Sequence, residues 1–276
     1  MKPPTVMIVI GQVLAEPWLS ITRDGQFATW LHDPVPESVV VRHSFGRPPG
    51  TVMSRLDRWH EWLRWHGRAR SIVPALDAWF GRRWLETSQK VDIAAFLKPE
   101  SVGWRQEMPD VYALQRWKVL GSLNMAVQEE FDFVYFTTAS SYVRISALTD
   151  YVGALPSTGV YAGTPMVDAV SGVGFASGAS RLMSRDVVQE VLRHRRKYVN
   201  DVMEDVGLGR LITGLGYDLI PWPSVNVDSF ATLESLSDAQ IEENFHFRMR
   251  SGTNRARQDV PLMKALHERV RELEDG

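Results

Sequence analysis

Two neighbouring carboxylates, Glu204 and Asp205, stand directly before a run of residues that is typical of a helix. A carboxylate at the start of a helix is stabilised by the helix dipole and can accept hydrogen bonds from free backbone N–H groups. The same carboxylate can act as a general base when a substrate proton lies within reach. These residue types therefore allow two roles, a helix cap or proton abstraction, and one side chain can fill both.

Other polar and small residues follow patterns that could serve a binding site. Asp110, Tyr112 and Lys118 have the spacing Asp-x-Tyr-x5-Lys. The stretch from Ser177 to Ser180 consists of small residues, and we expect it to form a loop. Such a loop either lets a substrate approach the backbone closely or is a plain turn between a strand and a helix.

Several other chemistries lack their signatures in this sequence. The chain has no cysteine, which excludes disulfides, thiolate zinc sites and a cysteine nucleophile. It has no Gly-x-x-x-x-Gly-Lys-[Ser/Thr] loop, no Gly-x-Gly-x-x-Gly after the first strand and no His-Glu-x-x-His. The 31 Lys and Arg residues are balanced by 33 Asp and Glu residues, so the protein has no overall positive charge. General electrostatic attraction to nucleic acid is therefore not the first interpretation.

The elements that must position these residues alternate between strands and helices. A β-branched run at residues 5–10 and a largely aromatic run at residues 131–136 predict buried strands, and a small polar loop, residues 137–141, follows the second. In open α/β sheets, ligands bind at the carboxyl ends of such strands. We further expect strands at 38–41, 91–97 and 217–221, and helices at 56–66, 110–130, 143–152, 184–192, 208–215 and from 259 onward. This order predicts one α/β domain over residues 1–276, with a mostly parallel central sheet flanked by helices.

Four motifs follow one another between residues 110 and 222, and a fifth lies further on: Asp110-x-Tyr112-x5-Lys118, Tyr161-x-Gly163, Ser177-Gly178-Ala179-Ser180, Glu204-Asp205-Val206-x-x-Gly209 and His246-Phe247-Arg248. The first four, taken in order, resemble those of the β-1,3-galactosyltransferase and Fringe-type glycosyltransferases, which have the GT-A fold. Bacterial and viral relatives of that group also end in a His-x-Arg segment, which the fifth motif resembles.

The resemblance implies a GT-A-like (Rossmann-like) fold and a hexosyltransferase-like enzyme. Such an enzyme moves a sugar from a nucleotide-sugar, here expected to be a UDP-sugar, onto an acceptor hydroxyl with inversion at the anomeric carbon. Residues 1–150 would bind the nucleotide-sugar and residues 151–276 would carry the acceptor and catalytic half. Asp205, or failing it Glu204, would be the base. The implied donor-binding residues are Gly11, Gln12, Lys118, Thr138, Ser140, Ser141, Arg181, His246 and Arg248, and the acceptor-binding residues are Ser177, Gly178 and Ala179.

The chain departs from that family at the metal site. Where the family has Asp-x-Asp, this chain has Thr138-Ala139-Ser140, and hydroxyls are weak ligands for Mg²⁺ or Mn²⁺. We therefore expect no cofactor and metal-independent transfer, with cationic side chains neutralising the leaving diphosphate. A divalent metal such as Mn²⁺ stays an alternative that the sequence does not support. The candidates for that neutralisation are Lys118, Arg181, His246, Arg248, Arg250, Arg255 and Arg257.

Two alternatives remain open. The chain could be a catalytically inactive relative that binds a nucleotide-sugar or a glycan, which the missing Asp-x-Asp favours and the retained carboxylate pair disfavours. It could also glycosylate a nucleic-acid base, in which case nucleic acid is the acceptor. The longest early apolar run, residues 6–10, is too short to span a membrane, so we expect a soluble protein of the cytoplasm.

Overall fold

The computed structural model describes residues 3–48, 50, 55, 89–92, 102–111, 114–169, 172–198, 203–252 and 257–276. The helix predicted at 56–66 and the candidate residues Tyr112 and Arg255 lie outside these ranges. Among the helices within them, none is both long and apolar enough to cross a membrane.

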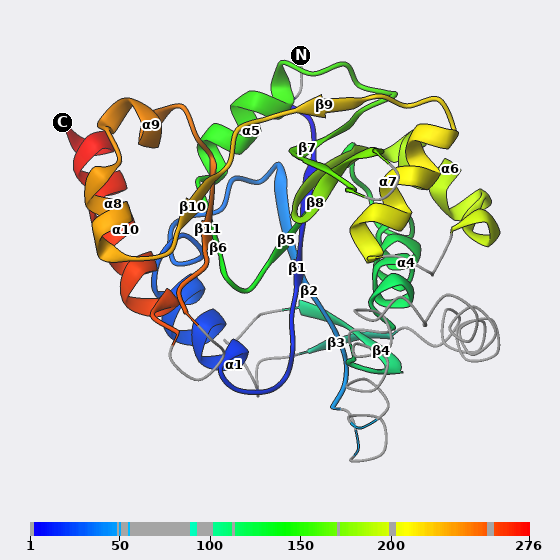
Figure 1. The fold of residues 1–276 in the computed structure, drawn as a ribbon, viewed down its shortest axis with the longest axis horizontal. Coiled ribbons are helices and arrows are strands. Elements are labelled where there is room, and N and C mark those ends of the chain that lie inside the picture. The colour runs from blue at the N-terminus through cyan, green and yellow to red at the C-terminus, as the bar shows by residue number, and fades with distance from the viewer. Residues whose placement is uncertain are drawn as a thin grey trace.

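An eight-stranded sheet runs through the centre of the protein in the order β3-β4-β2-β1-β5-β8-β7-β9 (Figure 1). Strands β4, β2, β1 and β5 are parallel to their neighbours in this series, whereas β8 pairs antiparallel with both β5 and β7. The sheet thus takes strands from both halves of the chain. Its strands are β1 (Val6–Gly11), β2 (Val39–Arg47), β3 (Gln89–Asp92), β4 (Val102–Pro109), β5 (Phe133–Thr138), β7 (Tyr161–Val167), β8 (Gly174–Ser184) and β9 (Leu219–Pro221).

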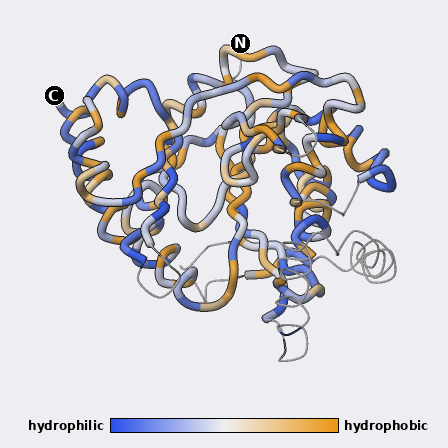
Figure 2. The backbone as a smooth tube through the Cα atoms, in the orientation of Figure 1, coloured by the Kyte–Doolittle hydropathy of each residue, from blue (hydrophilic) through white to orange (hydrophobic). Residues whose placement is uncertain are grey.

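Side chains of the central strands alternate between two hydrophobic cores. Val6, Ile8 and Ile10 of β1 pack into one core, while Met7 and Val9 pack into the other. The first core is closed by α5 and α10, and the second by α4, α6 and α7, which lie on the opposite side of the sheet (Figure 1). The trace of the central strands is accordingly mostly hydrophobic (Figure 2). The α-helices and short helical segments are α1 (Trp18–Ser20), η1 (Ile21–Gly25), η2 (Gln26–Ala28), α4 (Gln115–Ala126), α5 (Ile145–Gly153), α6 (Arg185–Arg193), η6 (Arg195–Lys197), α7 (Glu204–Gly214), α8 (Phe230–Ser235), α9 (Asp238–Glu242) and α10 (Asp259–Asp275).

A second, three-stranded sheet joins distant parts of the chain. It has the order β10 (Val225–Val227), β11 (His246–Met249) and β6 (Ser141–Val143). Strand β11 pairs antiparallel with β6, so that Arg248 lies opposite Ser141. This pairing brings the His-x-Arg segment beside the polar loop that ends β5.

The predicted α/β class, with a mostly parallel central sheet flanked by helices, is confirmed. Residues 10–12 and 138–141 lie at the ends of neighbouring strands, because β1 and β5 pair in parallel with Gly11 opposite Thr138.

Three local predictions are wrong. The stretch from Ser177 to Ser180 is not a loop but part of β8, where it lies at an irregularity in the pairing with β7, and Ser180 is paired with Thr137 of β5. The helix expected from residue 110 begins only at Gln115, since β4 extends to Pro109. The helix expected from residue 208 begins at Glu204, which places both carboxylates in its first turn.

Candidate active site

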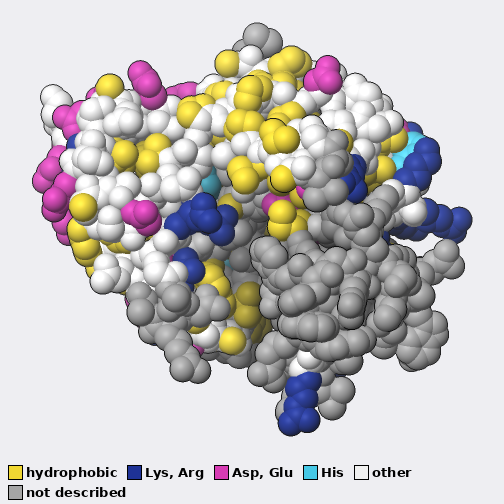
Figure 3. All heavy atoms as spheres, in the orientation of Figure 1, with side chains coloured by type: hydrophobic (Ala, Val, Ile, Leu, Met, Phe, Trp, Pro, Cys, Tyr) yellow, Lys and Arg dark blue, Asp and Glu magenta, His cyan; other side chains and the backbone are white. Residues whose placement is uncertain are grey.

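A cavity of about 340 Å³ opens where β1 and β5 end, within the size range of small-molecule sites. It is walled by the ends of these strands, by α1 and α4, by the middle of β8, by the start of α7 and by β11. Figure 3 shows Lys and Arg side chains at the edge of a hollow in this region of the molecule. The cavity is lined by Gly11, Val13, Trp18, Gln115, Lys118, Thr138, Ala139, Ser140, Ser177, Gly178, Ala179, Glu204, Asp205 and Arg248.

Most residues expected at the site from the sequence line this one cavity. Both carboxylates do so, as do the three small residues expected to meet the acceptor. Four of the residues expected to bind the donor do not appear in the lining: Gln12, Ser141, Arg181 and His246. All four are at most 1% exposed, and Gln12, Ser141 and Arg181 each contact a residue of the lining.

Asp205 presents a carboxylate to the cavity from the first turn of α7. One oxygen accepts a hydrogen bond from the backbone N–H of Gly178 at 3.3 Å, and the other accepts from the N–H of Val206 at 3.0 Å. The carboxylate is therefore oriented by β8 and by its own helix. Each oxygen keeps a lone pair that can accept a further proton donor from the cavity.

Glu204 is held by two buried side chains. Arg181 forms an ion pair with it at 2.9 Å, and the Tyr198 hydroxyl donates to the same carboxylate at 3.0 Å. Burial raises the pKa of Glu204, although the positive charge of Arg181 opposes this. Burial alone would lower the pKa of Arg181, but the Glu204 carboxylate raises it above its usual value. Glu204 is therefore tied into the wall, and Asp205 is the carboxylate with the more open surroundings.

Arg248 supplies a positive charge to the same cavity lining. Within the part of the chain that the structure describes, its Nε is buried and has no hydrogen-bond partner. Burial lowers the pKa of this guanidinium, and the charges of Arg250 and Arg257 lower it further. A half-buried cation crowded by two other cations, with an unused donor, is suited to receive an anionic ligand.

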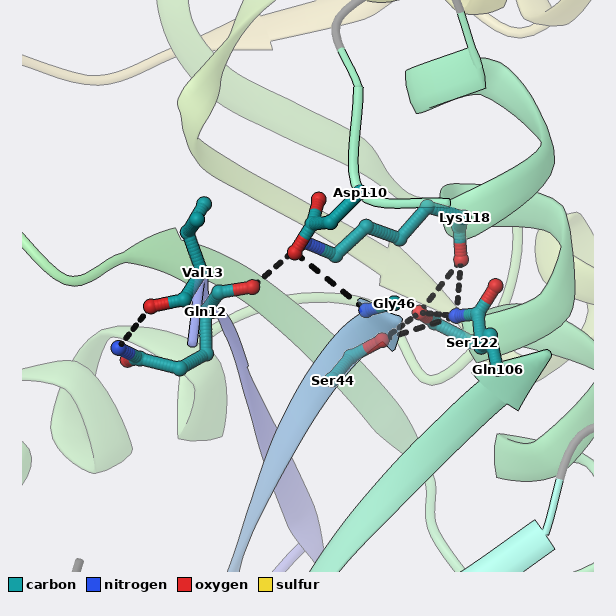
Figure 4. A network of polar contacts seen from close by, with 8 residues as sticks. All are labelled: Gln12, Val13, Ser44, Gly46, Gln106, Asp110, Lys118 and Ser122. Atoms are coloured by element: carbon teal, nitrogen blue, oxygen red, sulfur yellow. Dashed lines mark hydrogen bonds and ion pairs between the residues drawn. The ribbon is translucent and has the colours of Figure 1, made fainter. Parts of the chain in front are cut away.

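Lys118 lies at the centre of a buried polar network that ties the strand ends together (Figure 4). Its ammonium group donates to the Gln12 carbonyl at 2.6 Å and pairs with the Asp110 carboxylate at 2.9 Å. Gln106 in turn donates to the Lys118 carbonyl at 2.6 Å. The network fixes α4 against β1 and β4. The acceptors of Lys118 are thus protein groups, and its role is to hold the cavity wall.

The loop after β5 carries a connected set of hydroxyls. The Oγ1 atom of Thr138 lies 3.3 Å from the Oγ of Ser140 and 3.2 Å from the Oγ of Ser141. Ser141 also contacts the Nε2 of His246 at 3.1 Å, and the Nδ1 of that imidazole lies 2.9 Å from the Ser224 hydroxyl. Burial lowers the pKa of His246 to about 3, and the charge of Arg248 lowers it as well, so the imidazole is neutral.

Sequence reasoning missed four residues of the lining: Val13, Trp18, Gln115 and Ala139. A signal existed for Trp18, which is a large aromatic residue in an otherwise polar loop after the first strand. The guanidinium of Arg257 lies 4.7 Å from the centre of its ring and is itself paired with Asp259 at 2.7 Å. Arg257 therefore supports the ring of Trp18 and is less available to a ligand than Arg248.

The residues at the end of β5 do not fit the divalent metal that the Asp-x-Asp of the resembling family would hold. Thr138 and Ser140 offer neutral hydroxyls that already contact each other, whereas Mg²⁺ and Mn²⁺ prefer carboxylate oxygens. Throughout the described ranges, no group of three or more His, Asp or Glu side chains is arranged to hold a metal ion.

No protein-family model matches this chain, and no curated protein matches it. Among solved structures, the chain is similar to a glycosyltransferase involved in the glycosylation of the major capsid of PBCV-1, with 8% identity and a TM-score of 0.43 over 95% of this chain and 99% of that one. It is also similar to mouse xyloside xylosyltransferase 1 in its apo form, with 7% identity and a TM-score of 0.39 over 90% of this chain and 97% of that one. At values this low, the two likenesses carry no argument about activity.

Proposed function

We propose that this protein is a GT-A-type glycosyltransferase that transfers a sugar from a nucleotide-sugar, with a UDP-sugar as the first candidate, to an acceptor hydroxyl. The observation that carries the proposal is the placement of an oriented carboxylate, Asp205, and a cation with an unused donor, Arg248, in the lining of one cavity at the strand ends. The resemblance of residues 110–222 to Fringe-type enzymes supports the same assignment.

The proposed reaction is a single displacement with inversion. Asp205 removes the proton from the acceptor hydroxyl while the oxygen of that hydroxyl forms a bond to the anomeric carbon. The bond between that carbon and the diphosphate breaks, and its electron pair passes to the phosphate oxygen. Arg248 stabilises the negative charge that develops on this leaving group, so the reaction is proposed to need no metal ion.

The other walls of the cavity have matching tasks in this proposal. Trp18 offers an aromatic face on which a nucleobase or a sugar ring can stack. Gly178 and its neighbours on β8 form the side of the cavity that receives the acceptor, because the Gly178 N–H donates a hydrogen bond to the proposed base. A binding protein without catalysis would use the same cavity for the donor but would not need Asp205.

Donor binding can be tested by measuring the thermal shift of the protein with a panel of nucleotide-sugars and nucleoside diphosphates. A ligand that binds only the folded state raises the unfolding temperature, and the stabilisation grows as the logarithm of the ligand concentration once this exceeds the dissociation constant. We expect at least one nucleoside diphosphate to do so. Arg248→Ala should weaken its binding about 10- to 100-fold, the scale of a hydrogen bond to a charged group.

Arg250→Ala is the matched control, because Arg250 lies two residues further along and is exposed outside the cavity lining. It should keep binding within about threefold, since exposed charges contribute little. Equal binding by wild type and Arg248→Ala, or no shift with any member of the panel, would contradict the proposal.

A further inference from the structure

The buried imidazole of His246 connects the hydroxyl of Ser224 to a set of hydroxyls after β5 that lie far away in the sequence. Ser224 contacts Nδ1, and Ser141 contacts Nε2, at 2.9 Å and 3.1 Å. From Ser141 the contacts continue through Thr138 to Ser140, at 3.2 Å and 3.3 Å. His246, Ser140 and Ser141 are at most 1% exposed, whereas the Thr138 and Ser140 end of the chain lines the cavity.

A neutral imidazole carries one N–H, so its tautomer decides whether Nε2 donates to Ser141 or accepts from it, and the hydroxyls beyond Ser141 can follow the same direction. The ring also forms a hydrogen bond with the backbone of Ala179. If Nε2 carries the hydrogen, it donates to Ser141. Ser141 then donates to Thr138, and the last hydroxyl keeps a hydrogen that is free to point into the cavity. If Nδ1 carries the hydrogen, each hydroxyl must donate back toward Nε2. The cavity then faces oxygen lone pairs, which repel an anion.

We propose that His246 is a positioning residue that aligns the hydroxyls of Ser141, Thr138 and Ser140 so that the last of them donates to a phosphate group of the donor. This inference rests on the proposed function, because it assigns the diphosphate to the Thr138 and Ser140 side of the cavity. It differs from the expectation from sequence, in which His246 itself touches the diphosphate.

The hydroxyl chain and Arg248 form one anion-binding surface. Arg248 lies opposite Ser141 in the pairing of β11 with β6, so the cation and the hydroxyls are carried by adjacent strands. Backbone pairing holds them together as well, because the N–H of Met249 donates to the Ser140 carbonyl at 2.8 Å. Oriented hydroxyl donors beside a guanidinium supply hydrogen bonds and charge at a place where carboxylates would need a metal to bind phosphate.

The test measures binding of inorganic pyrophosphate and of UDP by calorimetry, in buffer containing EDTA. Pyrophosphate stands in for the diphosphate group that all nucleoside diphosphates share. We expect Ser141→Ala to bind both ligands about 5- to 10-fold more weakly than wild type, the cost of one lost hydrogen bond. Ser184→Ala is the control, because Ser184 is an equally buried serine at the far end of β8. It should bind like wild type.

Two further readouts separate alignment from simple loss of packing. His246→Gln keeps an amide N–H donor and should retain binding within about threefold, whereas His246→Leu should lose about tenfold or more. The ¹⁵N shifts of the His246 ring in the pyrophosphate complex should report the Nε2–H tautomer. Thermal melts of each variant confirm that it is folded.

The outcomes distinguish this inference from the proposed function. If wild type binds neither pyrophosphate nor UDP, the proposed function fails, and the alignment role fails with it. If wild type binds and Ser141→Ala binds equally well, the alignment role alone is wrong. An Nδ1–H tautomer in the complex, or a folded His246→Gln that binds as weakly as His246→Leu, would also overturn it.

Discussion

At the scale of single residues, we expect the largest effect on stability from breaking the ion pair between Lys118 and Asp110. Both side chains are 5% exposed, and the lysine also donates to the Gln12 carbonyl. Removing one partner leaves an uncompensated buried charge, so Lys118→Met should lower the free energy of unfolding by about 3–5 kcal/mol. Urea denaturation measures this.

The control for this prediction is the double variant Lys118→Met, Asp110→Leu. Because it removes both charges, it should be less destabilised than the sum of the two single variants. Strict additivity would show that the two side chains do not interact.

The Asp-x-Tyr-x5-Lys spacing predicted that Lys118 belongs to the site. It could not predict the Gln12 contact, because that partner lies 106 positions away in the sequence.

At the scale of elements, the close packing of α7 on β8 positions the Asp205 carboxylate beside Gly178. Gly209 in the middle of α7 allows this approach, since a Cβ there would overlap the Cβ of Phe175 on β8 and lie 3.1 Å from its Cα. We expect Gly209→Ala to destabilise the protein by about 1–3 kcal/mol through overpacking, although alanine favours helices.

Gly214→Ala on the same helix is the matched control, because a Cβ there meets nothing within 4 Å. It should change stability by between zero and a gain of about 1 kcal/mol from helix propensity. Thermal melts of both variants check the prediction. A Gly209→Ala protein as stable as wild type would show that α7 can move away from β8 at no cost.

The elements themselves could be predicted from the sequence where local pattern decides. The strands expected at 5–10 and 131–136 are runs rich in apolar residues, and they overlap the buried β1 and β5. Strand β8 could not be predicted from its small residues Ser177 to Ser180. It is a strand because β5 and β7 pair with it from both sides, and such pairing depends on residues distant in sequence.

At the scale of the whole molecule, buried neutral histidines make stability depend on pH. Burial lowers the pKa of His43 to about 4 from its ordinary 6.5, and burial lowers that of His246 to about 3. Below pH 6.5 the unfolded chain takes up protons that the folded protein does not, so the free energy of unfolding falls as the pH falls toward 4. Each histidine contributes up to about 1.4 kcal/mol per pH unit.

The pH prediction can be isolated at His43, which lies on β2 outside the cavity lining. Urea denaturation of wild type and His43→Gln between pH 7 and pH 5 should give a shallower pH dependence for the variant. The difference between the two slopes should approach one proton taken up on unfolding. Parallel pH profiles would mean that His43 titrates normally in the folded protein.

The cavity also depends on the fold as a whole, because strands from both ends of the sequence supply its walls. The order of motifs indicated the carboxylate pair and the His-x-Arg segment. It could not show that Glu204 is tied to Arg181 while Asp205 faces the cavity, because that difference depends on a buried ion pair between α7 and β8. Nor could it show that His246 lies behind the wall while Arg248 lines it.

The central claim, that Asp205 is the base of a sugar transfer in this cavity, is tested most directly by comparing donor affinity with turnover in Asp205→Asn. Calorimetry with the donor identified by the thermal-shift panel should give a dissociation constant near that of wild type, since the carboxylate faces the acceptor. Turnover should fall about 10²- to 10⁴-fold, as expected for loss of a positioned base. If Asp205→Asn keeps near-normal turnover, Asp205 is not the base and serves only to hold the first turn of α7 against Gly178 of β8.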